Sequence, residues 1–448
     1  MLRGARRWIA EWRPSTVTKG ASAFPLFVLF GLNAVDELDR AAFGVLLPDI
    51  RDHFGLSDAG ALRLVALTTI AVLLIEIPLS FYCDRRNRVR IATIGAAVWA
   101  VFSFGTGVAI AVGSLGLLVA ARIGAGGGRA VVTPTHSSLL SDYYEPAARV
   151  KVFSVHRQAN SVGLVLGPLL AGVLAEAFGL QWPFYVFAIP TAVFVLLALR
   201  LHEPVRGYHE RKAAGLDEEA ALVADQHETV VSTMKVLYRV RTIRRIWCAV
   251  PFLAVALFGV PNLLALVYED VFGLDSAARG LIAAGVEPLQ IIGVFVAMPR
   301  VADIALRDPG FLLRFVSVVG VVDGLLLVVL AYAPNVAVAV IMHGLLAASI
   351  GTLAPAFFAL VSIVAPARVR SASFSTISVF AIPGIAVFLP LIGQVSDRLG
   401  IQASIVVMVP IAVVAALILR SGSRFVVADI AAAFAPTPEP TRVPEPSE

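Results

Sequence analysis

Twelve long apolar stretches fill almost the whole of this 448-residue chain. An α-helix rises about 1.5 Å per residue, so an apolar run of about 20 residues crosses the hydrocarbon layer of a membrane. Hydrophobic residues make up 58% of the sequence and the mean hydropathy is +0.85, values too high for a soluble protein. The runs are continuous, whereas the strands of a membrane β-barrel alternate apolar and polar residues. The sequence therefore predicts an all-α polytopic membrane protein.

The apolar stretches fall into two sets of six. The first set lies near residues 22–50, 60–82, 91–112, 114–140, 150–178 and 182–200, and the second near 245–270, 277–300, 311–333, 335–364, 371–395 and 400–420. We expect twelve transmembrane helices, some of them tilted, because several runs exceed the length that a perpendicular span needs.

Lys and Arg residues are distributed unevenly between the two sets of loops. Most of the 36 lie in alternate loops, beginning with the N-terminal segment, and the opposite loops hold only Arg51, Arg63, Arg279 and Arg398. Because basic loops stay in the cytoplasm, we expect both termini there. The pI of about 9.4 then reflects topology, so we expect no nucleic-acid partner.

The two ends of the chain are polar. Residues 1–21 are basic and contain two tryptophans, a pattern that fits either an interfacial helix on an anionic leaflet or a basic tail that enforces topology. Residues 421–448 end in a Pro- and Glu-rich run, and we expect a disordered cytoplasmic tail. Cys83 and Cys248 fall at cytoplasmic span ends, where we expect no disulfide.

The chain repeats itself in two halves. We expect a six-helix bundle over residues 22–200, a cytoplasmic loop over 201–244 and a second bundle over 245–420. Three matches recur at offsets of 218, 219 and 221: residues 53–56 (HFGL) with 271–274 (VFGL), 148–151 (ARVK) with 367–370 (ARVR), and 133–134 (TP) with 354–355 (AP). Both halves begin on the same side, so the repeat is parallel and places a substrate site near the midplane between the halves.

This organisation resembles the major facilitator superfamily, whose signature loop follows the second helix. Residues 80–88 read SFYCDRRNR and resemble that loop, G-x-x-x-D-R-x-G-R, with Ser and Asn in place of the two glycines. The resemblance implies a cytoplasmic latch made by Asp84, Arg85 and Arg88, because a carboxylate beside arginines at a helix end can hold helices together. The alternative is that a cytoplasmic loop simply collects arginines.

The fifth span carries a second resemblance. Gly163-x-x-x-Gly167-Pro168-x-x-Ala171-Gly172 is similar to the motif of the superfamily's proton-coupled exporters, with alanine at one glycine position. Small residues four apart allow helices to approach closely, and proline releases a backbone hydrogen bond where a helix bends. The motif favours export, although ordinary helix packing would produce the same pattern.

Charged residues lie in the middle of the first span. At 100° per residue, Asn33, Asp36, Asp39 and Arg40 share one broad helical face, with Glu37 at its edge. Such charges are costly in a membrane and persist mainly where they face water, a substrate or each other. We expect Asn33 and Arg40 to line a polar path through the protein.

The fourth and fifth spans contribute further polar groups. Arg122, Arg129 and His136 recur every seven residues, so a straight helix would stack them on one face over about 20 Å. His156 and Arg157 extend this polar wall. The spans of the second half contain fewer ionisable residues, namely Glu287, Asp323 and His343.

Two interpretations of these charges compete. In one, they are fixed pairs that set helix register. In the other, an acid takes up a proton and releases an arginine, which then binds an anionic headgroup. The proton-coupling candidates are Asp39 first, then Glu37, then Asp36. The substrate candidates are Asn33, Arg40, Arg122, Arg129, His136 and Arg157.

Residues 39–50 (DRAAFGVLLPDI) resemble the first helix of the Spinster-like branch of the superfamily, in which D-R is followed by G-V-L-P-D-I. Arg122 and residues 126–130 (GGGRA) lie where that branch has R and G-x-G-E-A, so Arg129 replaces an acid that the branch uses for proton coupling. This reversal either removes the mechanism or shifts it to the first-helix acids. Spinster-like members move lysolipids and sphingoid phosphates, which implies an amphiphilic substrate.

We therefore expect a proton-coupled secondary transporter, acting as a monomer in a bacterial plasma membrane, that exports a lysolipid-like molecule or a hydrophobic drug. The alternative is a symporter that imports an organic acid or sugar. A sensor or an enzyme on a transporter fold is a remote alternative, because the sequence shows no nucleotide loop, metal-spaced cluster or nucleophile elbow. We expect no cofactor and no metal.

Overall fold

The computed structural model describes residues 13–84, 86–206, 230–365 and 370–433. Every regular element within these ranges is a helix, which confirms the all-α prediction. The basic segment of residues 1–12, with its two tryptophans, lies outside the described ranges, as do most of the central loop and the end of the tail.

The first half of the chain forms nine helices in the described residues. They are α2 (Pro14–Val17), α3 (Phe24–Val45), α4 (Leu47–His53), α5 (Asp58–Asp84), α6 (Arg88–Ala111), α7 (Leu115–Arg129), α8 (Val132–Tyr143), α9 (Pro146–Phe178) and α10 (Trp182–Ala198). Polar side chains cap the N-termini of two of them: the side chains of Asn87 and Ser114 accept hydrogen bonds from backbone N–H groups of α6 and α7. These caps satisfy donors that the first helical turn leaves free.

The second half follows the same plan. Its helices are α12 (Val230–Arg239), α13 (Arg241–Asp270), α14 (Ser276–Val286), α15 (Pro288–Arg307), α16 (Phe311–Ala331), α17 (Val336–Val364), α18 (Arg370–Leu399), α19 (Ile401–Gly422), the 3-10 turn η3 (Ser423–Phe425) and α20 (Val426–Ala433). Asp275 and Asn335 cap α14 and α17 in the same way.

Each of the twelve predicted apolar stretches coincides with helix, and ten helical segments of the described chain are long and apolar enough to cross a membrane. Of the other two, α10 is apolar but has 17 residues. Helix α3 has 22 residues and carries Asp36, Glu37, Asp39 and Arg40 in its middle.

Prolines interrupt two of the predicted spans. A turn at residues 130–131 separates α7 from α8, and Pro134 lies four residues beyond Ala130. A proline cannot donate to the carbonyl four residues earlier and its ring clashes with that group. Glu287 likewise separates α14 from α15, whose first residue is Pro288. The predicted fourth span is therefore one apolar segment built from two helices, α7 and α8. Because of the break, His136 does not continue a straight stack with Arg122 and Arg129.

The tail also differs from the prediction. The sequence predicts disorder over residues 421–448, but α19 continues to Gly422, and η3 and α20 extend the helical structure to Ala433. Val426 is fully buried and Ile430 packs against the main core, so apolar burial holds this segment in place. The Pro-rich residues 434–448 lie outside the described ranges.

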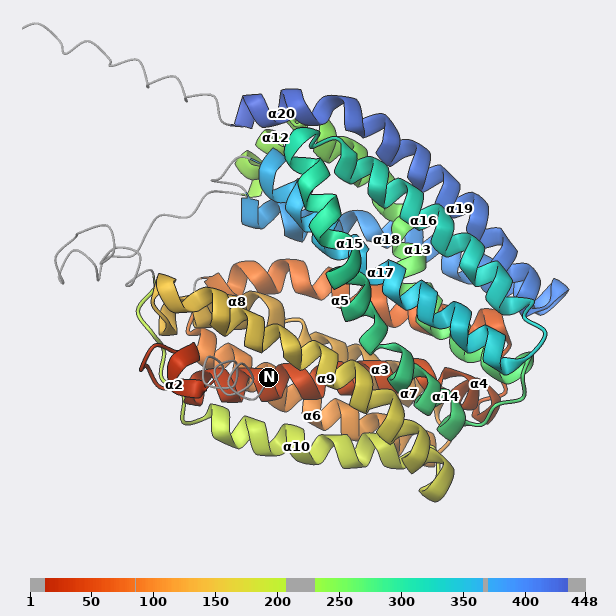
Figure 1. Ribbon diagram of the computed structural model, residues 1–448. Coiled ribbons are helices and arrows are strands. Elements are labelled where there is room, and N and C mark those ends of the chain that lie inside the picture. Colours follow the sequence, from red (N-terminus) through yellow and green to blue (C-terminus); the bar gives the residue numbers. More distant parts are fainter. Residues whose placement is uncertain (1–12, 85, 207–229, 366–369, 434–448) are drawn as a thin grey trace, which may run out of the picture.

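Figure 1 shows two groups of helices side by side, one from each half of the chain. Within the first group α3 packs on α9, and α6 packs on α7 and α10; within the second, α13 packs on α18 and α19, and α16 packs on α17 and α19. The groups meet through two equivalent contacts, α5 with α18 and α9 with α14. The repeat relates α5 to α14 and α9 to α18, so each of these contacts is the counterpart of the other.

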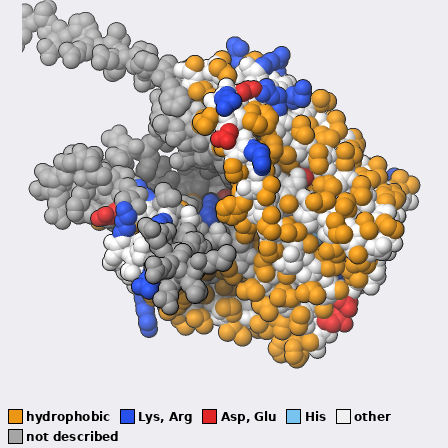
Figure 2. Space-filling model, viewed as in Figure 1, with side chains coloured by type: hydrophobic (Ala, Val, Ile, Leu, Met, Phe, Trp, Pro, Cys, Tyr) orange, Lys and Arg blue, Asp and Glu red, His pale blue; other side chains and the backbone are white. Residues whose placement is uncertain are grey.

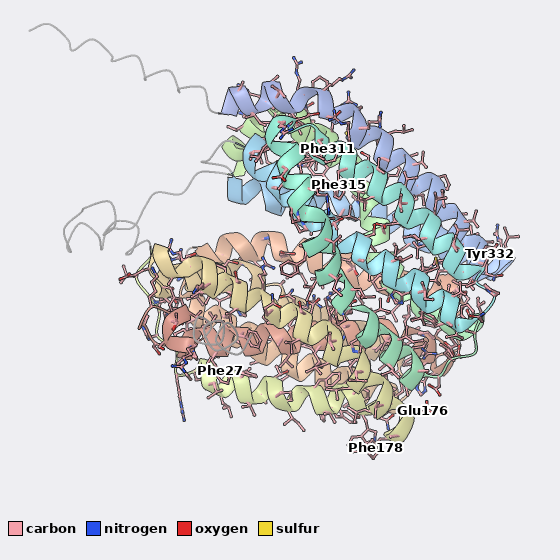
Figure 3. All side chains as sticks on the ribbon, in the orientation of Figure 1. Phe27, Glu176, Phe178, Phe311, Phe315 and Tyr332 are labelled. Carbon is pink, nitrogen blue, oxygen red and sulfur yellow. The ribbon has the colours of Figure 1, made fainter. Side chains whose placement is uncertain are left out.

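The helices run between two ends, which we name the α4 end and the α20 end. Helices α2, α12 and α20 lie at the α20 end, whereas α4 and the start of α14 lie at the other (Figure 1). The outer surface is largely apolar, and a hollow opens between the two groups at the α20 end (Figure 2). Phe178 and Tyr332 project near the α4 end (Figure 3); both are exposed, as aromatic residues at a membrane interface are.

Candidate functional site

Helix α3 places three acids and one arginine at the centre of the first group of helices. Asp36, Glu37 and Asp39 are all buried. Each of these acids has an arginine within ion-pair distance: Arg129, Arg40 and Arg122 respectively. The charges therefore form three pairs, and in the membrane such pairing lowers the cost of carrying ionised groups.

Asp39 makes the most complete set of contacts of the three acids. One carboxylate oxygen accepts a hydrogen bond from Ser103 of α6 at 2.6 Å, and the other accepts one from Arg122 of α7 at 3.0 Å. The guanidinium of Arg122 also lies over the ring of Phe43, 4.3 Å from its centroid. The pair thus joins α3, α6 and α7, and protonation of Asp39 would leave Arg122 without its carboxylate partner.

Asp36 and Arg129 form a looser pair. Their closest nitrogen and oxygen atoms are 3.3 Å apart, and that oxygen accepts no hydrogen bond from any described residue. Glu76 of α5 lies within electrostatic range of Arg129. The sequence interpretation missed Glu76, although a lone acid within an apolar span is the signal that would have identified it.

Arg40 is the most accessible guanidinium of the three. It binds Glu37 one helical turn earlier through two hydrogen bonds, yet 42% of its side chain is exposed, against 9% for Glu37. Glu287, at the break between α14 and α15, lies within electrostatic range of Arg40. Arg40 therefore faces the space between the two groups of helices.

His136 and Asn33 lie in a separate polar cluster between helices. The two rings of His136 and His156 are joined by a hydrogen bond of 3.3 Å between their nitrogens. Asn33 donates to Asn160 at 2.6 Å and to the backbone carbonyl of His156 at 3.4 Å. This cluster joins α3, α8 and α9, so the structure places Asn33 and His136 in contacts between helices.

Arg157 lies on another face of α9. It is exposed, and it precedes Pro168 by eleven residues, which is three helical turns along the same face. Around Pro168 that face packs on α14 of the second group. Arg157 therefore lies on the face of α9 that packs on the second group further along the helix.

The glycine motif of α9 serves two different contacts. A Cβ on Gly163 or Gly167 would lie 2.6 Å or 2.5 Å from a backbone oxygen of α3. A Cβ on Gly172 would lie 2.3 Å from the backbone oxygen of Ser276 in α14. The first two glycines thus allow close packing within a group, and the third allows it between the groups.

Of the predicted latch, Arg88 is the residue that the structure describes fully. Arg85 and the side chain of Asp84 lie outside the described residues. Arg88 is buried; it donates to Asp142 of α8, to Ser138 at 2.5 Å and to Glu203 beyond α10 at 2.8 Å. In this conformation Arg88 therefore ties helices of the first group to each other.

A network that the sequence interpretation missed joins the two groups at the α4 end. Arg51 forms two hydrogen bonds of 2.9 Å with Asp270 and one of 2.7 Å with Asp58. The carboxylates of Asp270, Asp58 and Asp52 outweigh the effect of burial and raise the pKa of Arg51, so it is charged at every working pH. The sequence repeat could have indicated this contact between the halves. At an offset of 218, residues 51 and 52 correspond to residues 269 and 270.

Two further contacts complete this network, which we call the α4-end network. Arg279 of α14 binds Asp49 of α4. Asp58 accepts a hydrogen bond from Ser396, and the backbone N–H of Ala59 donates to Asp397 of α18 at 3.2 Å. The network therefore holds the groups together at one end, while a hollow separates them at the other.

The ionisable residues of the second half are separate from each other. Asp323 of α16 is buried, and Ser349 of α17 lies beside its carboxylate. His343 shares a hydrogen bond of 3.1 Å with Tyr268. Glu287 accepts from Gln290. Both cysteines are free, and the described residues contain no group of three or more His, Cys, Asp or Glu able to hold a metal ion.

Comparison with known proteins gives one family and several relatives. The family profile described as Major Facilitator Superfamily matches residues 29–381. The cis,cis-muconate transport protein of Acinetobacter baylyi is 26% identical over 62% of this chain and 66% of its own length. Protein spinster homolog 1 of Bos taurus is 29% identical over 44% of this chain and 38% of its own. The chain thus spans about two thirds of the first relative and little more than a third of the second.

The fold is also that of solved transporters. The crystal structure of a bacterial homologue of the human lysosomal transporter Spinster, in an inward-facing and unoccupied conformation, aligns with a TM-score of 0.74. The alignment covers 91% of this chain and 98% of that one, at 19% sequence identity.

Proposed function

The chain belongs to the major facilitator superfamily, and from this premise we propose a proton-coupled secondary transporter that works by alternating access and exports an amphiphilic molecule. In this proposal α3 and α10 join the ten apolar spans to give twelve transmembrane helices. Both termini lie in the cytoplasm of a bacterial cell, and a single chain in the plasma membrane is the working unit. The two bundles are residues 22–200 and 245–420.

The observation that carries the proposal is the set of three ion pairs at the centre of α3, in a molecule whose bundles are joined at the α4 end. Figure 2 shows a hollow between the bundles at the α20 end. With the α20 end in the cytoplasm, this arrangement is an inward-facing state. Export then requires the network to break and the α20 end to close.

A zwitterionic headgroup matches an ion pair such as Asp39 with Arg122. Its ammonium can replace the arginine beside the acid, and its phosphate can bind the released guanidinium. The ammonium and a proton compete for the same carboxylate, so substrate binding expels the proton. Exchange of substrate against protons requires this competition. Lysolipids with a choline or ethanolamine headgroup carry both the ammonium and the phosphate.

A second candidate function is the import of an organic dianion together with a proton. The muconate transport protein among the relatives supports it, because muconate is a dicarboxylate that would use guanidinium groups. Protonation of Asp39 would free Arg122 for the anion, so proton and substrate would bind together. The exposed side chain of Arg40 supplies a further binding group.

The sign of proton movement distinguishes these two functions. Purified protein is reconstituted into liposomes that contain a pH-sensitive dye, and short-chain lysophosphatidylcholine, cis,cis-muconate or a cationic drug is added outside. Exchange predicts a rise in internal pH with the lysolipid, whereas co-transport predicts a fall with muconate. A response to cationic drugs alone would assign the acids as the substrate site. If none of the three compounds changes the internal pH, although the protein is folded, proton-coupled transport of these classes would be contradicted.

A further inference from the structure

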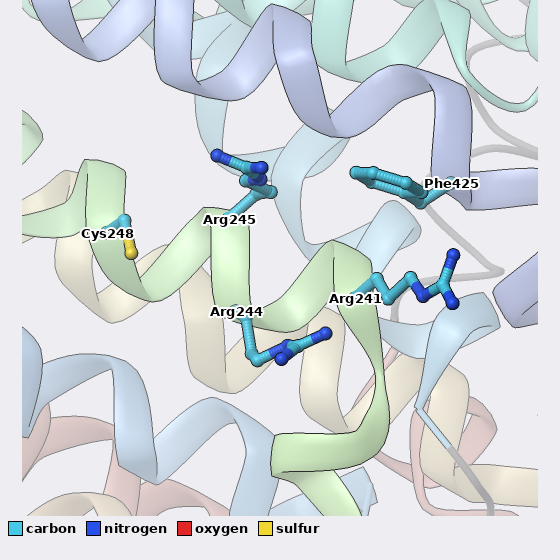
Figure 4. Close-up of a pocket in the computed structure, with 5 residues that line it drawn as sticks. All are labelled: Arg241, Arg244, Arg245, Cys248 and Phe425. Atoms are coloured by element: carbon cyan, nitrogen blue, oxygen red, sulfur yellow. The ribbon is translucent and has the colours of Figure 1, made fainter.

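A second candidate binding site lies at the α20 end of the second bundle, away from the charges of α3. A cavity of about 420 Å³ is lined by Arg241, Arg244, Arg245, Cys248 and Phe425. The four residues from α13 come from its first two turns, and Phe425 comes from η3 (Figure 4). The site is therefore built by two segments that are about 180 residues apart in the sequence.

The charges of this cavity are unbalanced. None of its three guanidiniums lies within ion-pair distance of a carboxylate in the described part of the chain. The nearby Asp429 of α20 accepts a hydrogen bond of 2.6 Å from the backbone N–H of Thr242 instead. Three positive groups around one cavity repel each other, and an anion within it would remove this repulsion.

The arginines are also held in place. The guanidiniums of Arg241 and Arg245 lie 5.6 Å and 6.0 Å from the centroid of the Phe425 ring. The face of an aromatic ring attracts a cation at this distance, so the ring stabilises the positions of both groups. Gly422 lets the end of α19 approach α13, since a Cβ there would be 3.0 Å from the Cβ of Arg245. Ordered guanidinium groups lose less entropy when they bind an anion.

The position of the cavity indicates the kind of anion. The apolar span of α13 begins at Arg241, so the cavity lies where a helix leaves the hydrocarbon layer and lipid phosphates are found. Guanidinium groups bind phosphate through paired, charge-assisted hydrogen bonds, and basic pockets between helices on the cytoplasmic side bind anionic headgroups. We propose that this cavity binds a phosphate-bearing anion, either the headgroup of an anionic phospholipid or soluble phosphate. The proposal is independent of the transported substrate.

Cys248 provides a direct reporter for this site. Its thiol is exposed and lines the cavity, whereas Cys83 is buried. A maleimide therefore labels Cys248 in the folded, detergent-solubilised protein. We expect phosphatidylglycerol, at concentrations that saturate the site, to slow this labelling about tenfold or more. Inorganic phosphate is the second probe, and uncharged monoolein is the third.

The variant R241Q/R244Q/R245Q removes the three charges of the cavity. A matched control, R90Q/R200Q/R307Q, removes three exposed arginines that lie outside it. We expect protection to disappear in the first variant and to persist in the second. The single variant R245Q, compared with R90Q, repeats the test with a smaller perturbation, and size-exclusion chromatography reports whether each protein is folded.

The outcomes separate the sources of phosphate. Protection by phosphatidylglycerol alone assigns the site to a lipid headgroup, and protection by inorganic phosphate assigns it to a soluble anion. Equal protection by monoolein would show that an acyl chain is sufficient, which overturns the proposal. Equal protection by phosphatidylglycerol in wild type and in the folded cavity variants would also overturn it.

Discussion

Among the paired arginines of the central site, Arg40 has the most exposed side chain. We predict that R40Q raises the KM for an anionic or zwitterionic substrate by about tenfold to a hundredfold, because charge-assisted hydrogen bonds contribute roughly 1.5–3 kcal/mol. The KM for a purely cationic substrate should change little. Transport assays on R40Q and on the exposed control R90Q measure the difference, and equal losses for both kinds of substrate would assign Arg40 a structural role.

His136 illustrates the opposite case, a buried polar residue that bonds to a side chain of a neighbouring helix. We predict that H136A lowers stability by about 1–3 kcal/mol, because it leaves Nε2 of the buried His156 ring without its partner. The KM of correctly folded protein should be unchanged. Thermal unfolding and transport are measured on the same preparations. A raised KM without a change in Tm would make His136 a substrate ligand after all.

The sequence could predict which residue types lie at the centre, but not how they pair. Helical periodicity places Asp36, Asp39 and Asn33 on one broad face. The partner of each depends on which helix lies beside it, and that is decided by the packing of the whole bundle. Asn33 therefore binds α9, whereas Asp39 binds α6 and α7, a division that no local spacing contains.

At the level of helices, two glycines of α14 provide a matched pair. A Cβ on Gly280 would lie 2.2 Å from the backbone oxygen of Pro168, but a Cβ on Gly285 would meet nothing within 4 Å. Alanine favours a helix by about 1 kcal/mol over glycine at either position. We predict that G280A separates α14 from α9 and reduces transport, whereas G285A is neutral or stabilising.

Spin labels on the exposed residues Val112 and Leu399, placed in a C83S/C248S background, measure the distance between the bundles at the α4 end. The distance distribution should broaden towards longer values in G280A and stay unchanged in G285A. The same distribution in both variants would contradict a role for this close contact in joining the bundles.

The helices themselves followed from hydropathy, because burial in lipid requires long continuous apolar runs. The interruption between α7 and α8 at residues 130–131 could not be predicted from hydropathy, because the apolar pattern continues through it. Pro134 is the residue that could have indicated the break. Helix α20 was missed for another reason. The Pro-rich run that follows it dominated the composition of the tail, although Val426 and Ile430 already marked an apolar face.

For the molecule as a whole, the α4-end network is the element that alternating access must break. We predict that R51D or D270R alone shifts the bundles towards opening at this end, because each places like charges together. The exchanged variant R51D/D270R should restore part of the original distance, measured with the same pair of labels, because the exchange restores this pair but leaves a carboxylate at position 51 facing Asp58. An unchanged distance in both single variants, with folded protein, would show that the pair of Arg51 with Asp270 does not hold this end closed.

If Asp39 carries the coupled proton, the neutral double variant D39N/R122Q should separate proton movement from substrate movement. This variant removes both charges of the pair, so it avoids a buried unpaired arginine. Substrate-evoked pH changes inside liposomes are compared with substrate uptake for wild type, D39N/R122Q and S103A. We expect the folded double variant to bind the headgroup more weakly and to move no protons with the substrate that it still takes up at high concentration, while S103A retains coupling. Proton movement at the wild-type ratio to substrate in D39N/R122Q would contradict it.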